Sequence, residues 1–310
     1  MTHVIDVKTV SKDFREIKAL DHLSFSVPEG KVYGFLGQNG AGKSTMIRIL
    51  LSLIQPDNGE VKVFGLNLKK DRKEILRRTG AMIEKPDLYK YLTATENLKI
   101  FSVMSGIKIS ENKMMKQLEK VGLAERANSK VKTYSQGMRQ RLGIAVALIH
   151  DPDLIILDEP MNGLDPQGIA DIRNLILHLS RDLKKTVFVS SHLLSEMELI
   201  ADHMLIIDKG KKIVEGKVSE LLNPKETNVE LETLNLQDSV TQIKNSVWAN
   251  NFERTEGEKI ILKMHSDQIP QFIRDVSQMN IAAISIRKKH SLEDYFLSLT
   301  AHHDVSATTN

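Results

Sequence analysis

A glycine-rich loop between an expected strand and an expected helix is the feature that most constrains what this chain can fold into. The strand covers 32–36, the helix covers 44–51, and the loop between them (the phosphate loop, 37–44) matches G-x-x-x-x-G-K-[ST]. Its glycines let backbone N–H groups converge on phosphate oxygens, and the helix N-terminus adds a dipole that favours an anion. We therefore predict a nucleotide-phosphate site formed by Gly37, Gln38, Asn39, Gly40, Ala41, Gly42, Lys43, Ser44 and Thr45.

Two residues of the phosphate loop have distinct expected roles. Lys43 would reach the β- and γ-phosphates, and Ser44 would supply a hydroxyl to Mg²⁺. An ordinary glycine-rich turn is the alternative, but the flanking strand and helix stand where phosphate binding requires them. A nucleoside triphosphate with Mg²⁺ is therefore the expected ligand.

Paired acids follow a second buried-strand pattern at 154–157. They are Asp158 and Glu159, and a parallel sheet would place this strand end on the same edge as the phosphate loop. Asp158 can hold Mg²⁺ through water, and Glu159 can polarise a water for in-line attack on the γ-phosphate. Taken alone, such a pair is more often a helix N-cap or a solvated turn; beside a phosphate loop the catalytic interpretation is favoured.

Composition excludes several classes of function. The chain has 310 residues and no cysteine, which excludes disulfides, thiolate zinc sites and cysteine nucleophiles. Its longest apolar run, 142–149, is far shorter than the roughly 18 residues that span a bilayer. No signal-peptide pattern opens the chain, so cytosolic residence is the default expectation. A formal net charge of +3 is too small to indicate nucleic-acid binding.

Two domains of different character are expected along the chain. β-rich runs alternate with helical patterns up to about 213, with 91–149 mostly helical, which is typical of an α/β domain with some antiparallel strands near its start. The segment 223–228 contains Pro224 and resembles a linker; the chain is net basic up to Asn223 and net acidic after it. The rest suits a small α+β domain with strands at 229–234, 259–264 and 281–287 and helices at 236–247, 269–279 and 291–299.

The order of the remaining motifs resembles one family. The segment 134–141 reads Y-S-Q-G-M-R-Q-R, N-G-L-D follows the acids at 162–165, and His192 follows a strand pattern at 187–189. Together with the phosphate loop and the acids, these motifs resemble the nucleotide-binding subunit of ATP-binding cassette (ABC) transporters over about residues 4–220.

This resemblance implies an ABC-type ATPase domain with a RecA-like core, an antiparallel β subdomain and a helical subdomain. The ATPase domain would cover 1–222, with its helical subdomain at about 88–150. A linker at 223–228 and a C-terminal accessory α+β domain at 229–310 would complete the chain.

The resemblance also implies a role for each matching residue. Ser135, Gln136 and Gly137 (the signature segment) look like the residues that close over the γ-phosphate held by a partner subunit. Two ATP molecules would then be shared across a head-to-tail pair. Asp165 resembles the end of the loop that crosses this dimer interface, and His192 resembles the histidine that contacts the γ-phosphate.

Two further residues are assigned by the same resemblance. Phe14 occupies the place of the adenine-stacking aromatic, for which a core or edge-strand aromatic is the alternative. Glu84 stands where most members carry a glutamine that senses Mg²⁺ and the attacking water while touching the permease. A carboxylate there should bind metal more strongly than an amide, or repel the triphosphate when metal is lacking. The expected metal ligands are therefore Ser44, Asp158 and Glu84.

Departures from the usual family pattern indicate a subgroup. The signature commonly reads L-S-G-G-Q, and here Tyr134, Gln136 and Met138 replace three of those residues. The S-Q-G-M sequence, Glu84, the run 33–37 and the ending 291–296 resemble the cassette ATPases that export bacitracin and lantibiotics and give immunity or resistance.

The expected function is therefore ATP hydrolysis that powers export of a peptide antibiotic, with Glu159 and His192 as catalytic residues. One phosphate loop and one signature per chain imply a second ATP-binding subunit, expected as a homodimer, and separate membrane permease subunits. This places the protein peripherally at the cytoplasmic face of the cell membrane. The alternatives are an exporter ATPase for another hydrophobic substrate or drug, a soluble cassette protein acting on nucleic acid or the ribosome, and a GTPase switch. The last is disfavoured because this sequence has no N-K-x-D motif, which reads guanine.

Overall fold

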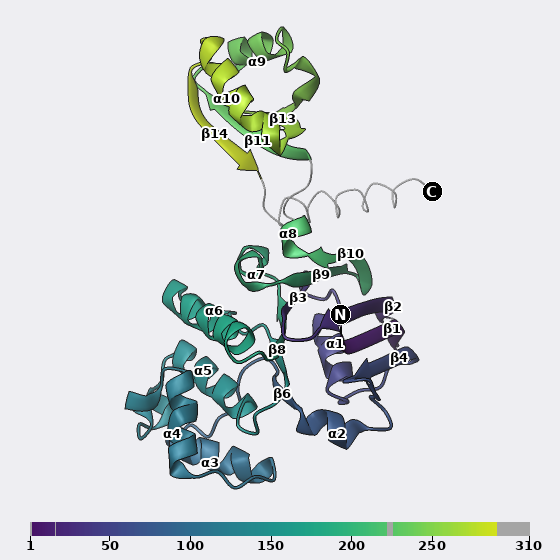
Figure 1. The fold of residues 1–310 in the computed structure, drawn as a ribbon, viewed down its shortest axis with the longest axis vertical. Helices are drawn as coiled ribbons and strands as arrows, with labels where there is room; N and C mark the ends of the chain where they lie inside the picture. Colours follow the sequence, from purple (N-terminus) through teal and green to yellow (C-terminus); the bar gives the residue numbers. More distant parts are fainter. Residues whose placement is uncertain (1, 16, 222–225, 290–310) are drawn as a thin grey trace. The chain divides into compact units, whose positions relative to one another are not determined.

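The chain divides into two compact units, Met1–Val218 and Ser219–Asn310. The computed structural model describes residues 2–15, 17–221 and 226–289 (Figure 1). No helix within these described ranges has the length and hydropathy needed to span a membrane.

A mostly parallel sheet forms the centre of the first unit. Its described strands follow the order β10-β9-β3-β8-β7-β6, and only β10 runs antiparallel to its neighbour. β3, β7 and β8 are buried at every position, which explains why they carry apolar runs rather than an alternating pattern of apolar and polar residues. The strands are β3 Val32–Leu36, β6 Thr79–Met82, β7 Leu154–Asp158, β8 Thr186–Ser191, β9 His203–Asp208 and β10 Lys211–Lys217.

An antiparallel sheet packs against the parallel one. Its described strands follow the order β2-β1-β4-β5 and are β1 His3–Phe14, β2 Ile17–Pro28, β4 Asn58–Val63 and β5 Leu66–Asn67. Phe25 of β2 stacks on Tyr33 and Phe35 of β3, with ring centroids 6.0 and 5.7 Å apart. These aromatic contacts join the two sheets in one core and pack against one face of β3, the strand that leads into the phosphate loop.

Helices cover the parallel sheet and form a separate region. α3, α4 and α5 contact one another and gather away from the antiparallel sheet (Figure 1). α6 and α7 contact β3, and α1 packs into the core between the sheets. The helices of this unit are α1 Lys43–Leu50, α2 Arg72–Arg77, α3 Ala94–Met104, α4 Glu111–Lys120, α5 Gln136–Ala147, α6 Pro166–Arg181 and α7 Leu194–Ile200, with 3₁₀ turns at Ala124–Arg126 and Val131–Thr133; α8 Val218–Leu221 follows β10.

The second unit is an antiparallel sheet with two α-helices packed on it in its described part. The strand order is β12-β13-β11-β14. Trp248 and Phe272 meet edge to face, with ring centroids 5.2 Å apart, inside a core that includes Leu231 and Leu262. The elements are β11 Glu226–Thr233, α9 Leu236–Lys244, β12 Phe252–Glu256, β13 Lys259–His265, α10 Ile269–Gln278 and β14 Ala283–Lys289, with 3₁₀ turns at Ala249–Asn251 and Ser266–Gln268.

The predicted fold class is confirmed, and the element boundaries differ in places. β12 has no counterpart in the sequence prediction, because three of its five residues are charged and it is held by pairing with β13. β11 begins at Glu226, inside the segment expected as a linker. It does so because its pairing with β13 starts at Glu226 and its pairing with β14 starts at Asn228. α9 ends at Lys244, before the expected 247. The helix expected at 291–299 and residues 223–225 of the linker lie outside the described residues.

Candidate active site

The register of the parallel sheet brings three distant segments to one edge. Leu36 at the end of β3 pairs with Ser191 of β8, and Asp158 at the end of β7 pairs with Ser190 of β8. The phosphate loop, Glu159 and His192 each follow one of these strand ends. The carboxyl edge of the sheet is therefore where the predicted catalytic residues meet.

Close backbone packing shapes the phosphate loop. Gly42 has a φ of 107° and is the N-cap residue of α1, and a Cβ there would lie 2.5 Å from the carbonyl oxygen of Ala19. A Cβ on Gly37 would lie equally close, 2.5 Å, to the carbonyl oxygen of Ile207. α1 begins without a side-chain cap, so the N–H groups of its first turn are directed at the loop without a capping oxygen.

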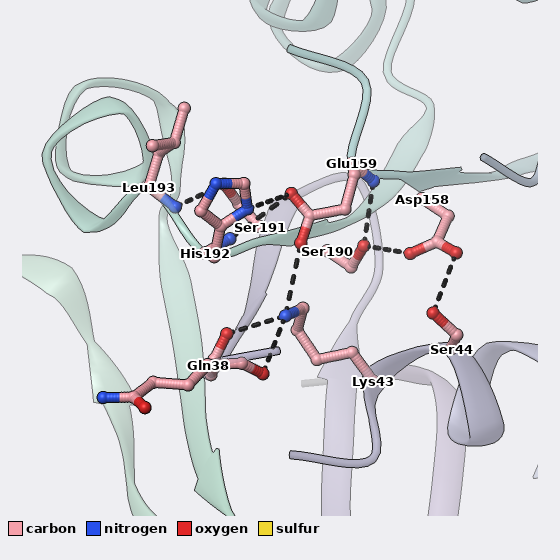
Figure 2. A network of polar contacts seen from close by, with 10 residues as sticks. Gln38, Lys43, Ser44, Asp158, Glu159, Ser190, Ser191, His192 and Leu193 are labelled. Atoms are coloured by element: carbon pink, nitrogen blue, oxygen red, sulfur yellow. Dashed lines mark hydrogen bonds and ion pairs between the residues drawn. The ribbon is translucent and has the colours of Figure 1, made fainter. Parts of the chain in front are cut away.

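Lys43 is buried at the centre of the loop. Only 6% of its side chain is exposed. Its Nζ donates to the carbonyl oxygens of Gly37 and Gln38, at 2.7 and 3.2 Å, and lies 3.2 Å from Oε1 of Glu159 (Figure 2). A buried ammonium requires such partners, because removing it from water without them costs several kcal/mol. The Lys43 ammonium is thus surrounded by two loop carbonyl oxygens and one carboxylate oxygen.

Glu159 links Lys43 to His192. Its Oε2 lies 2.8 Å from Nδ1 of His192, while its backbone N–H donates to Oγ of Ser190 at 3.0 Å (Figure 2). The backbone of Glu159 has a φ of 48°, a left-handed conformation that is uncommon for residues other than glycine. This turn directs the carboxylate back over the phosphate loop, so Lys43, Glu159 and His192 form one continuous polar chain.

Asp158 lies beside Ser44 and is buried. The Ser44 hydroxyl donates to Oδ2 at 3.2 Å, and the Ser190 hydroxyl donates to Oδ1 (Figure 2). Burial raises the pKa of Asp158, and the two hydroxyl donors oppose that rise. A hydroxyl and a carboxylate oxygen side by side next to a phosphate loop are the hard donors that Mg²⁺ prefers, so this pair fits the expected metal.

Glu84 contacts a cation rather than the other expected metal ligands. Its Oε1 lies 3.2 Å from Nη2 of Arg48 on α1, and 66% of its side chain is exposed. Its negative charge nevertheless reaches the acids, since it contributes to the raised pKa of Asp158. Within the described ranges, no group of three or more His, Cys, Asp or Glu side chains is arranged to hold a metal ion. Glu84 is thus positioned to act on the site through charge.

A cavity of about 340 Å³ opens over the phosphate loop. Phe14 lies at the end of β1 and is 46% exposed, and its ring lines this cavity together with Ile17 and Ala19. Asn39, Gly40, Thr45 and Glu159 also line it. The structure thus brings the predicted stacking aromatic and the phosphate loop to the same cavity.

The signature segment lies at the start of α5, away from that cavity. Ser135 is the N-cap residue, accepting from the backbone N–H of Met138 at 3.2 Å. Gln136 donates to the carbonyl oxygen of Asn162 at 3.3 Å, and Asp165 caps α6. The signature segment therefore touches the loop that follows Glu159. Within the described residues, none of Ser135, Gln136 and Gly137 lines the cavity over the phosphate loop of its own chain.

Two residues of the site were not singled out from the sequence. Ser190 accepts from Glu159 N and donates to Asp158, and Arg48 pairs with Glu84. The sequence could have indicated Ser190, because it directly follows the apolar strand pattern at 187–189, just before His192. Arg48 had none, since an arginine in the first helical turns after the loop is compatible with any solvated helix face.

Gly42→Ala should disrupt nucleotide binding more than Gly40→Ala. The first substitution adds both a clash with Ala19 and a left-handed strain of about 1–2 kcal/mol. Gly40 has a φ of 83° but an open surrounding, so its substitution adds the strain alone. We expect Gly42→Ala to weaken binding of a fluorescent ATP analogue by at least about tenfold beyond Gly40→Ala, a difference of about 1.4 kcal/mol. Equal affinities for the two variants would contradict the packing argument.

Comparison with known proteins agrees with this geometry. The ABC transporter family model matches residues 20–162. A bacitracin transport ATP-binding protein of Bacillus licheniformis is 40% identical over 300 residues, covering 96% of this chain and 98% of that protein. A lantibiotic transport ATP-binding protein of Streptococcus pyogenes is 41% identical over 212 residues, 68% of this chain and 90% of that protein.

A solved structure agrees as well. A dimeric ATP-binding cassette in a post-hydrolysis state with ADP and phosphate is 28% identical, with a TM-score of 0.61, over 69% of this chain and 98% of that one. The chain belongs to the ABC transporter family as one of its ATP-binding subunits, which are ATPases coupled to transport.

Proposed function

We propose that this ATPase powers the export of a peptide antibiotic of the bacitracin or lantibiotic kind through separate membrane permease subunits, giving immunity or resistance. The observation that carries the proposal is the 40% identity to a bacitracin transport ATP-binding protein over 300 residues, since this similarity includes the second unit. The similarity to the lantibiotic transport protein covers 68% of the chain. We infer that the protein works peripherally at the cytoplasmic face of the membrane.

In the proposed reaction, a water oxygen attacks the γ-phosphorus while the bond to the β,γ-bridging oxygen breaks. Glu159 orients this water and accepts its proton, and ADP and phosphate leave. Ser44 and Asp158 would hold Mg²⁺, which supplies positive charge to the phosphate oxygens when bound. Lys43 and His192 are placed to balance the rest of the γ-phosphate charge.

ATP binding must first break an ion pair. Glu159 Oε1 lies 3.2 Å from Lys43 Nζ, so the γ-phosphate competes with this carboxylate for the ammonium. His192 holds the other oxygen at 2.8 Å and keeps the carboxylate hydrogen-bonded when Lys43 turns to the phosphate. Release of Glu159 from Lys43 then provides the base with a free oxygen for water. Binding and activation of the base are thereby one event.

A second subunit is proposed to complete each site. Ser135 and Gly137 lie at the start of α5, outside the cavity over their own phosphate loop. The cassette of known structure with ADP and phosphate is dimeric, which supports a head-to-tail homodimer of this chain on nucleotide binding. The Ser135 hydroxyl and the N–H groups of the first turn of α5 would then meet the γ-phosphate of the partner's ATP.

Glu159→Gln should stop turnover and raise ATP affinity at once. The amide cannot take a proton, so hydrolysis should fall by about 10²- to 10⁴-fold. It also removes the anion that competes for Lys43, so the Kd for ATP should fall by about fivefold, a change of ~1 kcal/mol. Steady-state phosphate release and isothermal titration check the two parts, and size-exclusion chromatography should show an ATP-bound dimer.

The matched control for this variant is Glu74→Gln, which removes one exposed acid on α2. It should leave both hydrolysis and affinity unchanged. Undiminished hydrolysis by Glu159→Gln would remove Glu159 from the role of base. Unchanged ATP affinity would show that the Lys43 ion pair does not oppose nucleotide binding.

Glu84→Gln should keep ATP binding but change its metal dependence and its coupling to export. The substitution removes the Arg48 ion pair and a negative charge that raises the pKa of Asp158. We expect the Mg²⁺ concentration for half-maximal hydrolysis to change by about two- to threefold. Identical metal titrations together with full export in cells would show that the carboxylate has no special role.

Antibiotic resistance tests the proposed substrate. The chain and the membrane proteins encoded beside it are expressed in a sensitive bacterium, and minimal inhibitory concentrations are compared for bacitracin, a lantibiotic and an unrelated hydrophobic drug. Protection against either peptide, lost with Glu159→Gln and kept with Glu74→Gln, supports the proposal. Protection against the drug alone would replace the peptide by another substrate class.

A further inference from the structure

A basic pocket lies at the opposite edge of the sheet from the ATP site. It has a volume of about 580 Å³ and is formed by the loop before α4, one face of α4 and the segment after α5. We call this cavity the basic pocket, and its lining includes Ile107, Lys108, Ile109, Lys113, Lys116, Lys120, Leu148, Ile149, His150 and Asp151.

Four lysines give this pocket positive charge, and Asp151 is the one acid of its lining. Lys113, Lys116 and Lys120 are spaced i, i+3 and i+7 on α4 and so share one helix face, and Lys108 joins them from the loop. In the described part of the chain, Lys108, Lys113 and Lys116 form no ion pair. Like charges held together cost free energy unless an anion binds them.

The single acid of the lining is neutralised from outside the pocket. Asp151 lies 2.8 Å from Nζ of Lys185, and this contact holds the pKa of Asp151 below its usual value. Its carboxylate therefore pairs mainly with Lys185, and Lys120 of the pocket adds a smaller electrostatic interaction. The pocket keeps a positive net charge that attracts anions.

Apolar side chains and His150 complete the lining of the pocket. Leu148 and Ile149 are buried beneath it, and Ile107 and Ile109 are half-buried beside the lysines. Nε2 of His150 lies 3.1 Å from the carbonyl oxygen of Thr79 and must be the donor. Its Nδ1 is buried without a hydrogen-bond partner in the described structure, and buried polar atoms are normally paired.

The pocket is separate from the ATP site. His150 contacts Thr79, the first residue of β6, and Asp151 precedes the start of β7 at Leu154. The catalytic Asp158 ends β7, a whole strand length of about 16 Å away. A ligand in the basic pocket therefore does not reach the phosphate loop.

We propose that the basic pocket binds an acidic amphiphile, that is, a phosphate group carried on an apolar chain. Four lysines suit the phosphate, and the isoleucine and leucine side chains suit the apolar part. The volume lies within the range of specific small-molecule sites and exceeds what a bare phosphate fills. The same chemistry is offered by an anionic phospholipid in a bilayer and by a phosphorylated amphiphile in solution.

A single cysteine makes the test direct, because the chain has none of its own. Asn112→Cys places an environment-sensitive fluorophore on the exposed side of α4, beside the pocket but outside its lining. The full chain is saturated with a non-hydrolysable ATP analogue and Mg²⁺ so that phosphate cannot occupy the ATP site. Dihexanoyl phosphatidate and inorganic phosphate are then titrated separately.

Charge reversal separates the pocket from general electrostatics. Lys113→Glu with Lys116→Glu should weaken phosphatidate binding by at least about tenfold. Lys69→Glu with Lys70→Glu, an exposed pair elsewhere with the same charge change, should leave it within about twofold. Far-UV circular dichroism and retained nucleotide binding confirm that both double variants fold.

The outcomes decide the proposal. Saturable phosphatidate binding that only the pocket variant loses supports it. Equal loss in both double variants, no saturable signal, or equally tight binding of inorganic phosphate would overturn it. Co-sedimentation with phosphatidylcholine vesicles, with and without phosphatidylglycerol, identifies the source: pocket-dependent binding to the anionic vesicles supports a membrane lipid, and binding of free phosphatidate alone supports a soluble amphiphile.

Discussion

The buried ammonium of Lys43 is the interaction on which the site depends. It is held by two loop carbonyls and by the carboxylate of Glu159, and these contacts tie the phosphate loop to the end of β7. Such a buried charge pair contributes little net stability, because its desolvation offsets most of the attraction. The pair matters because the γ-phosphate of ATP can replace the Glu159 carboxylate at the Lys43 ammonium in the proposed reaction. In the proposed reaction, nucleotide binding therefore creates no unpaired buried charge, and it frees the Glu159 carboxylate to accept the proton of water.

The backbone at the end of β7 separates the tasks of two neighbouring acids. Asp158 remains in the extended strand and points to Ser44, and burial raises its pKa. Glu159 takes a left-handed φ of 48°, which turns its carboxylate to Lys43 and His192. Strained backbone of this kind costs about 1–3 kcal/mol and persists only where the surroundings impose it. Here the hydrogen bonds from Glu159 N to Ser190 impose it.

The sequence predicted those parts of the structure that local physics determines. The central strands are continuous apolar runs, and Gly42 fits a position that no side chain could occupy, so β3, β7, α1 and the loop were predictable. Strand β12 was not, because Arg254 and its acidic neighbours lack an apolar pattern and depend on cross-strand pairing and ion pairs. The Arg48–Glu84 pair joins residues 36 apart, and only the tertiary register brings them together. The roles assigned to the individual site residues, those of the signature segment and of Glu84 among them, stay predictions.

The helix α5 connects features that the sequence shows as unrelated. It begins at the signature segment with Ser135 as its cap, and the segment after its last turn lines the basic pocket. A helix of 12 residues is about 18 Å long and moves largely as a rigid body. Whatever shifts its C-terminal end therefore shifts the residues that face a partner's ATP in the proposed dimer. The carboxyl edge of the sheet places Asp158 and Glu159 beside the phosphate loop, whereas the opposite edge gathers the four lysines of the basic pocket, and α5 runs from the signature segment to that pocket.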